Sequence, residues 1–157
     1  MIPGLSEKAK NKIKEIIARY PQKQAAILPV LRLVKEELGF IDHEAEKFTA
    51  ALFDVHPIRV REIVTFYSML NQSQLGKYHI QVCSNLSCSI MGAQTLIEYL
   101  SQKLGIKPGG TTKDKKFTLS TVECLGACEK APCMMINFEY YGNLTREKID
   151  DILNRLE

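Results

Sequence analysis

The chain has 157 residues, enough to bury the core of one ordinary domain, or of a small domain with a helical extension. Its composition, 45% hydrophobic and 25% charged, is typical of a soluble globular protein, and a net charge of +3 is too small to indicate a polyanionic partner. We therefore expect no nucleic-acid partner.

The first ten residues, MIPGLSEKAK, contain no apolar signal core. The longest apolar run, AAILPVL at 25–31, is far shorter than the roughly 20 residues that a membrane span requires. We expect a cytoplasmic protein without direct membrane insertion. In that reducing compartment, five cysteines are more often metal ligands or catalytic groups than disulfides.

Residues 1–73 are predicted to form an N-terminal bundle of four short helices, because apolar residues recur there at helical spacing. The second helix should end at Gly39, and Pro29 should mark its start or bend it. The fourth should begin at Pro57 and bury four residues on one face: Val60, Ile63, Val64 and Tyr67.

The polar stretch NQSQLG, at 71–76, marks the expected boundary to a second domain, 74–157. The predicted order in this domain is β-α-β-β-β-α, which makes the whole chain an α/β (α+β) protein. The expected elements are a strand at 78–83, a helix at about 89–104, strands at 117–121, 133–138 and 139–142, and a helix at 145–156 capped by Thr145.

Four of the cysteines form two closely spaced pairs. Cys83 and Cys88 have the spacing C-x4-C, and Cys124 and Cys128 have the spacing C-x3-C. Each pair follows a predicted strand, so two neighbouring strands would bring four sulfurs to one end of the sheet. Four converging thiolates can hold zinc or an iron-sulfur cluster.

The width of the two loops favours a 2Fe-2S cluster over zinc, since structural zinc sites usually use tight C-x2-C pairs. A redox-active disulfide pair and four unconnected structural cysteines remain the alternatives. The three histidines are scattered along the chain, which argues against a Rieske-type site: His43, His56 and His79.

A cluster held by four thiolates is anionic and becomes more so on reduction. We expect backbone amides to stabilise this charge, because Cys88 lies where a helix beginning near Ser89 would present unpaired N–H groups. Gly92, Gly126 and Ala127 would allow the backbone to approach the sulfurs closely.

Cys133 is the spare thiol in this interpretation. It begins an apolar strand just after Pro132, where a buried free cysteine serves as a small hydrophobic residue. A redox-active or alternative-ligand role is the other possibility. Met91 is expected to fill the core.

Three segments resemble the thioredoxin-like 2Fe-2S ferredoxin family, and in particular its member in respiratory complex I (NADH-quinone oxidoreductase), the E-type subunit of bacteria. They are GFIDHEAEKFTAALFDVHPIRVREIVTFYSML, KYHIQVCSNLSCSIMGA and VECLGACEKAP. The resemblance implies a thioredoxin-like 2Fe-2S domain, a cis bond between Ala131 and Pro132, and four cluster ligands: Cys83, Cys88, Cys124 and Cys128.

The sequence departs from this family at three positions. Cys133 replaces a residue that is usually aliphatic, Lys115 replaces a common turn glycine, and Phe138 occupies a hairpin position that is usually acidic. We expect the two turns to differ locally from the family, while none of the three positions is a cluster ligand.

The resemblance also implies a function. NADH gives up two electrons as hydride, and a 2Fe-2S cluster accepts one, so a flavin must stand between them. Because this sequence has no nucleotide-binding motif, FMN and NADH are expected on a partner subunit, against which the helices of 1–73 dock. The chain would be an electron carrier inside an enzyme complex, peripheral on the inner face of the membrane.

Three other functions fit the residues less well. An equivalent subunit of a soluble NAD-linked hydrogenase or formate dehydrogenase is the nearest of them. A redox-sensing DNA-binding regulator would read bases through Arg59, Arg61 and Thr65, but the region around them has few cations for phosphates. A thioredoxin-like thiol enzyme needs a C-x-x-C pair, which this sequence lacks.

Overall fold

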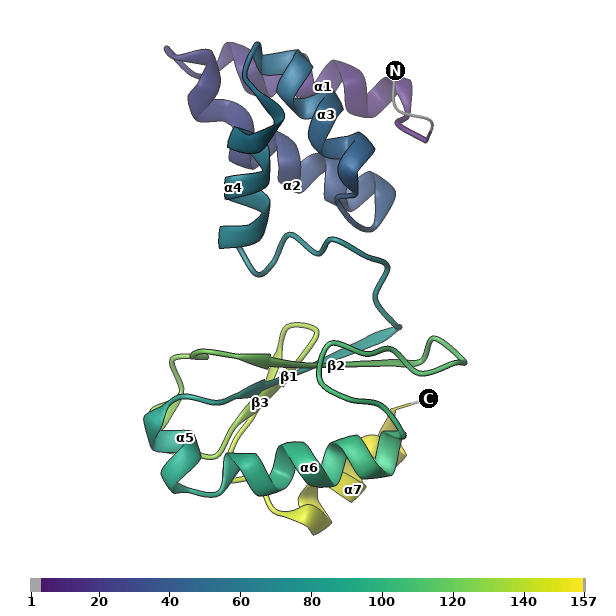
Figure 1. Cartoon of the computed structure of the whole chain (residues 1–157), viewed down its shortest axis with the longest axis vertical. Coiled ribbons are helices and arrows are strands. Elements are labelled where there is room, and N and C mark those ends of the chain that lie inside the picture. Colours follow the sequence, from purple (N-terminus) through teal and green to yellow (C-terminus); the bar gives the residue numbers. More distant parts are fainter. Residues whose placement is uncertain (1–3, 157) are drawn as a thin grey trace. The chain divides into compact units, whose positions relative to one another are not determined.

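The computed structural model describes residues 4–156. The chain divides into two compact units, Met1–Gln74 and Leu75–Glu157. The first contains the helices α1 to α4, and the second contains a sheet with α5, α6 and α7 (Figure 1). Within 4–156, no helix is both long and apolar enough to cross a membrane.

The helical unit contains the four helices that the apolar periodicity predicts. Ser6 and Asp42 cap α1 and α3, since their side chains accept hydrogen bonds from Ala9 N and Ala45 N. Pro29 lies in the first turn of α2, after a short 3-10 turn, so it marks the start of that helix. The helices are α1 (Glu7–Ala18), α2 (Ile27–Leu38), α3 (His43–Phe53) and α4 (Pro57–Phe66).

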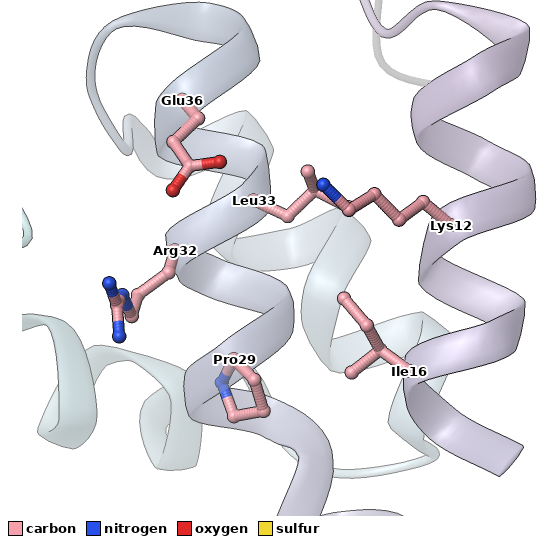
Figure 2. A pocket seen from close by; sticks show the side chains of 6 residues that line it. All are labelled: Lys12, Ile16, Pro29, Arg32, Leu33 and Glu36. Atoms are coloured by element: carbon pink, nitrogen blue, oxygen red, sulfur yellow. The ribbon is translucent and has the colours of Figure 1, made fainter. Parts of the chain in front are cut away.

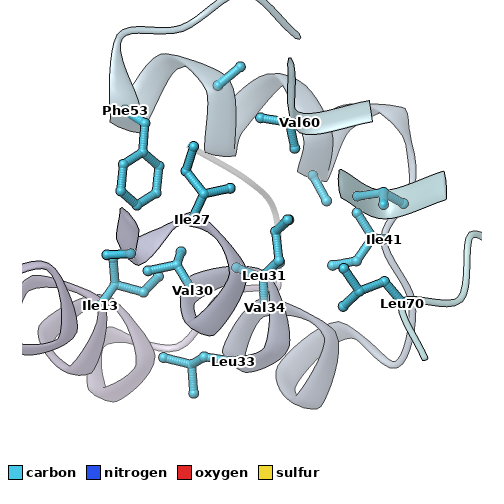
Figure 3. Close-up of a cluster of buried hydrophobic side chains, with 14 of the residues drawn as sticks. Ile13, Ile27, Val30, Leu31, Leu33, Val34, Ile41, Phe53, Val60 and Leu70 are labelled. Atoms are coloured by element: carbon cyan, nitrogen blue, oxygen red, sulfur yellow. The ribbon is translucent and has the colours of Figure 1, made fainter. Parts of the chain in front are cut away.

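Aliphatic side chains from all four helices fill the core of the helical unit (Figure 3). Val30, Leu31 and Val34 of α2 are fully buried at its centre. The carboxylate of Glu46 on α3 is buried too, and Arg61 on α4 donates to it at 3.0 Å. This ion pair joins α3 to α4 and satisfies a charge that would otherwise be costly to bury.

The end of α4 differs from the prediction. Val60 and Val64 are buried, but Tyr67 lies at the C-terminal cap and is partly exposed, and Phe66 has 79% of its surface exposed. The reason is that the helix ends at Phe66, where the chain leaves the helical path and no longer follows the periodicity that pointed Tyr67 inward.

The α/β unit contains a four-stranded sheet in the order β2-β1-β3-β4. β1 and β2 run parallel, while β3 is antiparallel to both β1 and β4. Helices α6 and α7 lie on one face of this sheet (Figure 1), where they share a core with Ile80, Leu119 and Met134. The strands are β1 (Tyr78–Cys83), β2 (Phe117–Val122), β3 (Met134–Ile136) and β4 (Glu139–Tyr141).

The helix expected at about 89–104 is two helices, α5 (Leu86–Ile90) and α6 (Ala93–Leu104). Gly92 separates them because its φ of 89° lies in the left-handed region, which interrupts a right-handed helix. Met91, expected in the core, lies at this break and is 58% exposed. Cys88 is consequently inside α5 and not in front of a long helix.

The last part of the chain follows the predicted order with one shorter strand. β3 ends at Ile136 because Asn137 has a φ of 55° and turns the chain into β4. Thr145 caps α7 (Arg146–Arg155), as expected.

Two backbone features agree with the family resemblance. The Ala131–Pro132 bond is cis. Lys115 has a φ of 57°, a conformation that suits the glycine common at this position in the family.

Candidate metal centre

The two cysteine loops begin side by side at one edge of the sheet. β1 and β2 are parallel neighbours, and their last residues, Cys83 and Val122, are paired in register. The backbone N–H of Ser84 donates to the carbonyl of Val122 at 2.9 Å, which extends this pairing into the loops. The expectation that the two strands preceding the cysteine pairs are neighbours is confirmed.

A third cysteine reaches the same edge from β3. The antiparallel register pairs Val82 with Met134, and the Cys83 N–H donates to the Cys133 carbonyl at 3.1 Å. Cys83 and Cys133 are therefore cross-strand neighbours. Because directly paired residues place their side chains on the same face of a sheet, the two thiols lie next to each other, in a buried cluster that also contains Cys88 and Ala93.

Three thiols consequently form a buried group. The sulfurs of Cys83, Cys88 and Cys133 all lie within 4.8 Å of one another, and Cys88 Sγ is 3.7 Å from Cys133 Sγ. Each side chain is at most 2% exposed. Small and apolar residues surround the group: Ala93, Ala131, Leu125 and Ala127.

The second cysteine pair is exposed. Cys124 and Cys128 both lie at the surface, in the loop that follows β2, and Cys128 opens the short 3-10 turn Cys128–Lys130. The Gly126 N–H donates to Cys124 Sγ at 3.2 Å. Among the described residues, the thiols grouped within 4.8 Å do not include this pair. A two-iron cluster that takes two sulfurs on each iron does not need all four sulfurs that close together.

The second loop nevertheless contacts the buried group through Cys83. Its thiol donates to the Glu123 carbonyl at 3.7 Å, and the backbone N–H of Leu125 also interacts with its sulfur. The residues on either side of Cys124 therefore lie against the sulfur of Cys83, which places the start of the second loop next to the first.

The three buried thiols differ in acidity. Burial opposes ionisation of Cys83, but hydrogen bonds from the backbone N–H groups of Asn85 and Leu125 and from the other two thiols outweigh it and lower its pKa. Burial raises the pKa of Cys88. Burial and the two neighbouring thiols raise the pKa of Cys133 to about 12.

Backbone amides are thus the donors that the structure places at the sulfurs of Cys83 and Cys124. No basic side chain is among the groups that shift the pKa of Cys83 or Cys88. This agrees with the expectation that amides stabilise negative charge here, although these donors belong to the loops and not to the start of a long helix.

An apolar surface lies beside Cys88. Leu86, Ile90 and Met91 on and after α5 are large, hydrophobic and mostly exposed, while Cys88 between them is buried. Such a group of exposed apolar side chains next to a buried site is typical of a surface that a partner covers.

The helical unit has a hollow of a different kind, between α1 and α2 (Figure 2). Its described lining contains neither thiols nor imidazoles, so it offers no sulfur ligand to an iron-sulfur cluster. The lining residues are Lys12, Ile16, Pro29, Arg32, Leu33 and Glu36.

A parallel strand pair that ends in two cysteine loops, with an antiparallel β3 after a cis-proline, defines a thioredoxin-like ferredoxin fold. The chain matches the model of the family "Thioredoxin-like [2Fe-2S] ferredoxin" over residues 13–157. The protein belongs to this family.

Two relatives that match most of the chain are both named as E-type subunits of NADH-quinone oxidoreductase. The chain is 40% identical over 144 residues to the second such subunit of Rhizobium meliloti (strain 1021), covering 92% of this chain and 86% of that protein. It is 42% identical over 150 residues to the E-type subunit of Rickettsia conorii (strain ATCC VR-613 / Malish 7), covering 94% and 90%.

A solved structure shares the fold. The air-oxidized NAD+-reducing NiFe hydrogenase superposes with a TM-score of 0.68 at 22% identity, over 83% of this chain and 22% of that chain. At this identity the likeness shows the fold alone.

The prediction that Cys133 is buried at the start of the apolar strand is confirmed, but the sequence did not indicate that its sulfur lies beside Cys88. The sequence carries no local signal for this closeness, because it depends on the register of β3 against β1 and on β3 lying next to β1 in the sheet.

Proposed function

We propose that this protein is the E-type electron-carrier subunit of an NADH-quinone oxidoreductase, and that it holds one 2Fe-2S cluster. Membership of the 2Fe-2S ferredoxin family and the names of relatives about as long as this chain support this proposal. The observation that carries it is the parallel pair β1 and β2, which starts both cysteine loops at one sheet edge.

The proposed ligands are Cys83, Cys88, Cys124 and Cys128. The donor set fits the cluster, because the site offers thiol sulfur and no carboxylate or imidazole in its buried group, and thiolates are the usual ligands of 2Fe-2S clusters. When bound, the cluster supplies one-electron redox chemistry.

The chain's own residues contribute charge stabilisation and exclusion of water. Backbone N–H groups of Asn85, Leu125 and Gly126 point to sulfurs of Cys83 and Cys124, where they offset negative charge without bringing in a mobile cation. The burial of Cys83 and Cys88 keeps water from one half of the site. Both effects tune the potential at which the site accepts an electron.

The partner in this proposal is an FMN-binding, NADH-oxidising subunit. A flavin must divide the two electrons of a hydride before a one-electron centre can take one of them. The apolar surface of Leu86, Ile90 and Met91 lies beside Cys88 and offers a place for that subunit to cover the cluster.

The helical unit is the second proposed docking element. Ile58 and Phe66 on α4, with Met69 just after it, are large exposed apolar residues on a helix whose other face is buried in the core. A partner that covers them would remove this apolar surface from water. In the assembled complex the chain would be peripheral, on the cytoplasmic side of the membrane.

The side chains that a DNA-binding role needs are engaged within the helical unit. Arg59 pairs with Glu62 and Arg61 with the buried Glu46, both at 3.0 Å. The Thr65 hydroxyl donates to the Arg61 carbonyl at 2.8 Å. These contacts support our expectation that the chain does not bind nucleic acid.

The test is to purify the protein without oxygen, count its iron and sulfide, and record its electron paramagnetic resonance after reduction. Two irons and two sulfides per chain with the signal of a reduced 2Fe-2S centre are expected. Zinc, or no metal at all, would overturn the proposal.

A second experiment identifies the partner subunit. Tagged protein should co-purify with an FMN-containing subunit, and co-purification with a hydrogenase or formate-oxidising subunit would assign the chain to a different complex.

A further inference from the structure

The structure holds a fifth thiol beside the proposed cluster ligands. Cys133 is 1% exposed, and its sulfur lies 3.7 Å from Cys88 Sγ and within 4.8 Å of Cys83 Sγ. The proposed function assigns it no role, because the four ligands come from the two loops.

The distance between Cys88 and Cys133 is that of two ligands on one metal. Two thiolates bound to a tetrahedral metal at about 2.3 Å each lie about 3.8 Å apart. The Sγ–Sγ separation of 3.7 Å matches this value. The pair Cys88 and Cys133 is therefore spaced to share a metal without a change in backbone.

Cys133 also occupies a position equivalent to that of Cys83. The two residues are cross-strand neighbours, joined by the 3.1 Å hydrogen bond from Cys83 N–H to the Cys133 carbonyl, and their side chains leave the sheet on the same face. When the Cys83 sulfur is missing, the Cys133 sulfur is already on that face, beside Cys88.

We propose that Cys133 is a reserve cluster ligand that replaces Cys83 and binds together with Cys88. This inference rests on the proposed function, since it needs a 2Fe-2S cluster at this edge of the sheet. The exchange is a ligand substitution: the Cys133 thiol releases one proton and its sulfur forms a bond to iron, while the bond from Cys83 to iron breaks and the Cys83 thiolate takes up one proton, so that no electron is transferred.

Cys133 can replace a ligand of the first cysteine pair only. Cys124 and Cys128 are exposed, and neither belongs to the group of sulfurs that lies within 4.8 Å. Loss of Cys124 should therefore not be compensated. This asymmetry distinguishes a reserve ligand from a cysteine that merely helps the domain fold.

The experiment compares Cys83→Ala with Cys83→Ala/Cys133→Ala, both purified without oxygen as full chains. Cys83→Ala should retain two irons and two sulfides per chain in at least half of the molecules, with a shifted electron paramagnetic resonance signal. The double variant should contain about tenfold less cluster. Cys133→Ala alone should keep the cluster and the wild-type signal.

The matched pair is Cys124→Ala and Cys124→Ala/Cys133→Ala, in which both variants should lose the cluster equally. Far-ultraviolet circular dichroism of each protein verifies that the sheet is folded, and Cys83→Val, with and without Cys133→Ala, replaces Cys83→Ala if the latter does not fold. Equal cluster content in Cys83→Ala and its double variant, whether high or low, would overturn the reserve role. A wild-type protein without a 2Fe-2S cluster would instead overturn the proposed function.

Discussion

The first cysteine pair lies inside the α/β unit, whereas the second lies on its surface. Cys83 is the last residue of β1, and Cys88 is packed in α5, so strand pairing and core contacts hold both. Cys124 and Cys128 lie in a loop that has only one short 3-10 turn. This difference predicts that folding alone positions the first cysteine pair, while the second pair becomes fixed only when the proposed cluster is bound.

Removal of an exposed ligand should have the largest effect. Cys124→Ala leaves the second pair with one thiol and no neighbouring sulfur in reserve, so we expect complete loss of the cluster. Iron and sulfide analysis after anaerobic purification measures this. Cys133→Ala is the matched control and should keep two irons, and a Cys124→Ala protein with a full cluster would contradict the importance of the exposed pair.

Removal of the iron should increase the mobility of the second cysteine loop much more than that of β1. With a chelator under reducing conditions, we expect the amides of Leu125 and Gly126 to exchange hydrogen about 100-fold faster, because the second loop loses the bonds of Cys124 and Cys128 to iron. The amides of Ile80 and Val82 in β1 should change little, since the sheet holds them.

Hydrogen exchange measured by mass spectrometry, with and without iron, tests this difference. Equal acceleration in β1 and in the second loop would show that the first half of the site is not preformed. No acceleration in either would show that the second loop is held by the protein alone.

A smaller effect on the second loop is expected from Gly142→Ala, because residue 142 lies against the end of that loop. A Cβ at this position would lie 2.3 Å from Lys130 Cβ and 2.8 Å from the Lys130 carbonyl, so the turn Cys128–Lys130 must move. Overpacking of this kind costs about 2 kcal/mol. We expect faster release of iron to a chelator and a lower urea midpoint of unfolding.

Glu139→Ala, an exposed substitution in the preceding hairpin strand, is the control for this variant and should release iron at the wild-type rate. If Gly142→Ala releases iron no faster than Glu139→Ala, the position of Lys130 does not matter for the site.

The smallest effect should come from the cap of α5 in the first loop. The Asn85 side chain accepts a hydrogen bond from Leu86 N at 2.8 Å, and loss of such a cap costs about 1 kcal/mol. Asn85→Ala should lower the free energy of unfolding of the cluster-free protein by that amount. Ser87→Ala, exposed on the same helix, should leave it unchanged, and a similar loss in both variants would rule out the cap as the cause.

The sequence by itself determined the elements and the two cysteine pairs. Hydrophobic periodicity and cap residues such as Asp42, Pro57 and Thr145 depend on neighbours within a few residues, so they are readable along the chain. The predicted boundaries of helices and strands were wrong where the backbone angle of a single residue ends the element, as at Gly92 and Asn137. These two positions divided a predicted helix and shortened a predicted strand.

Only the tertiary structure decided which thiols lie together. The closeness of Cys133 to Cys88 depends on β3 pairing antiparallel with β1, and on a register that sets Cys133 opposite Cys83. A shift of one residue would turn the Cys133 side chain to the other face of the sheet. Register is fixed by contacts between strands about 50 residues apart, as in the pairing of Val82 with Met134, and spacing along the chain carries no record of them.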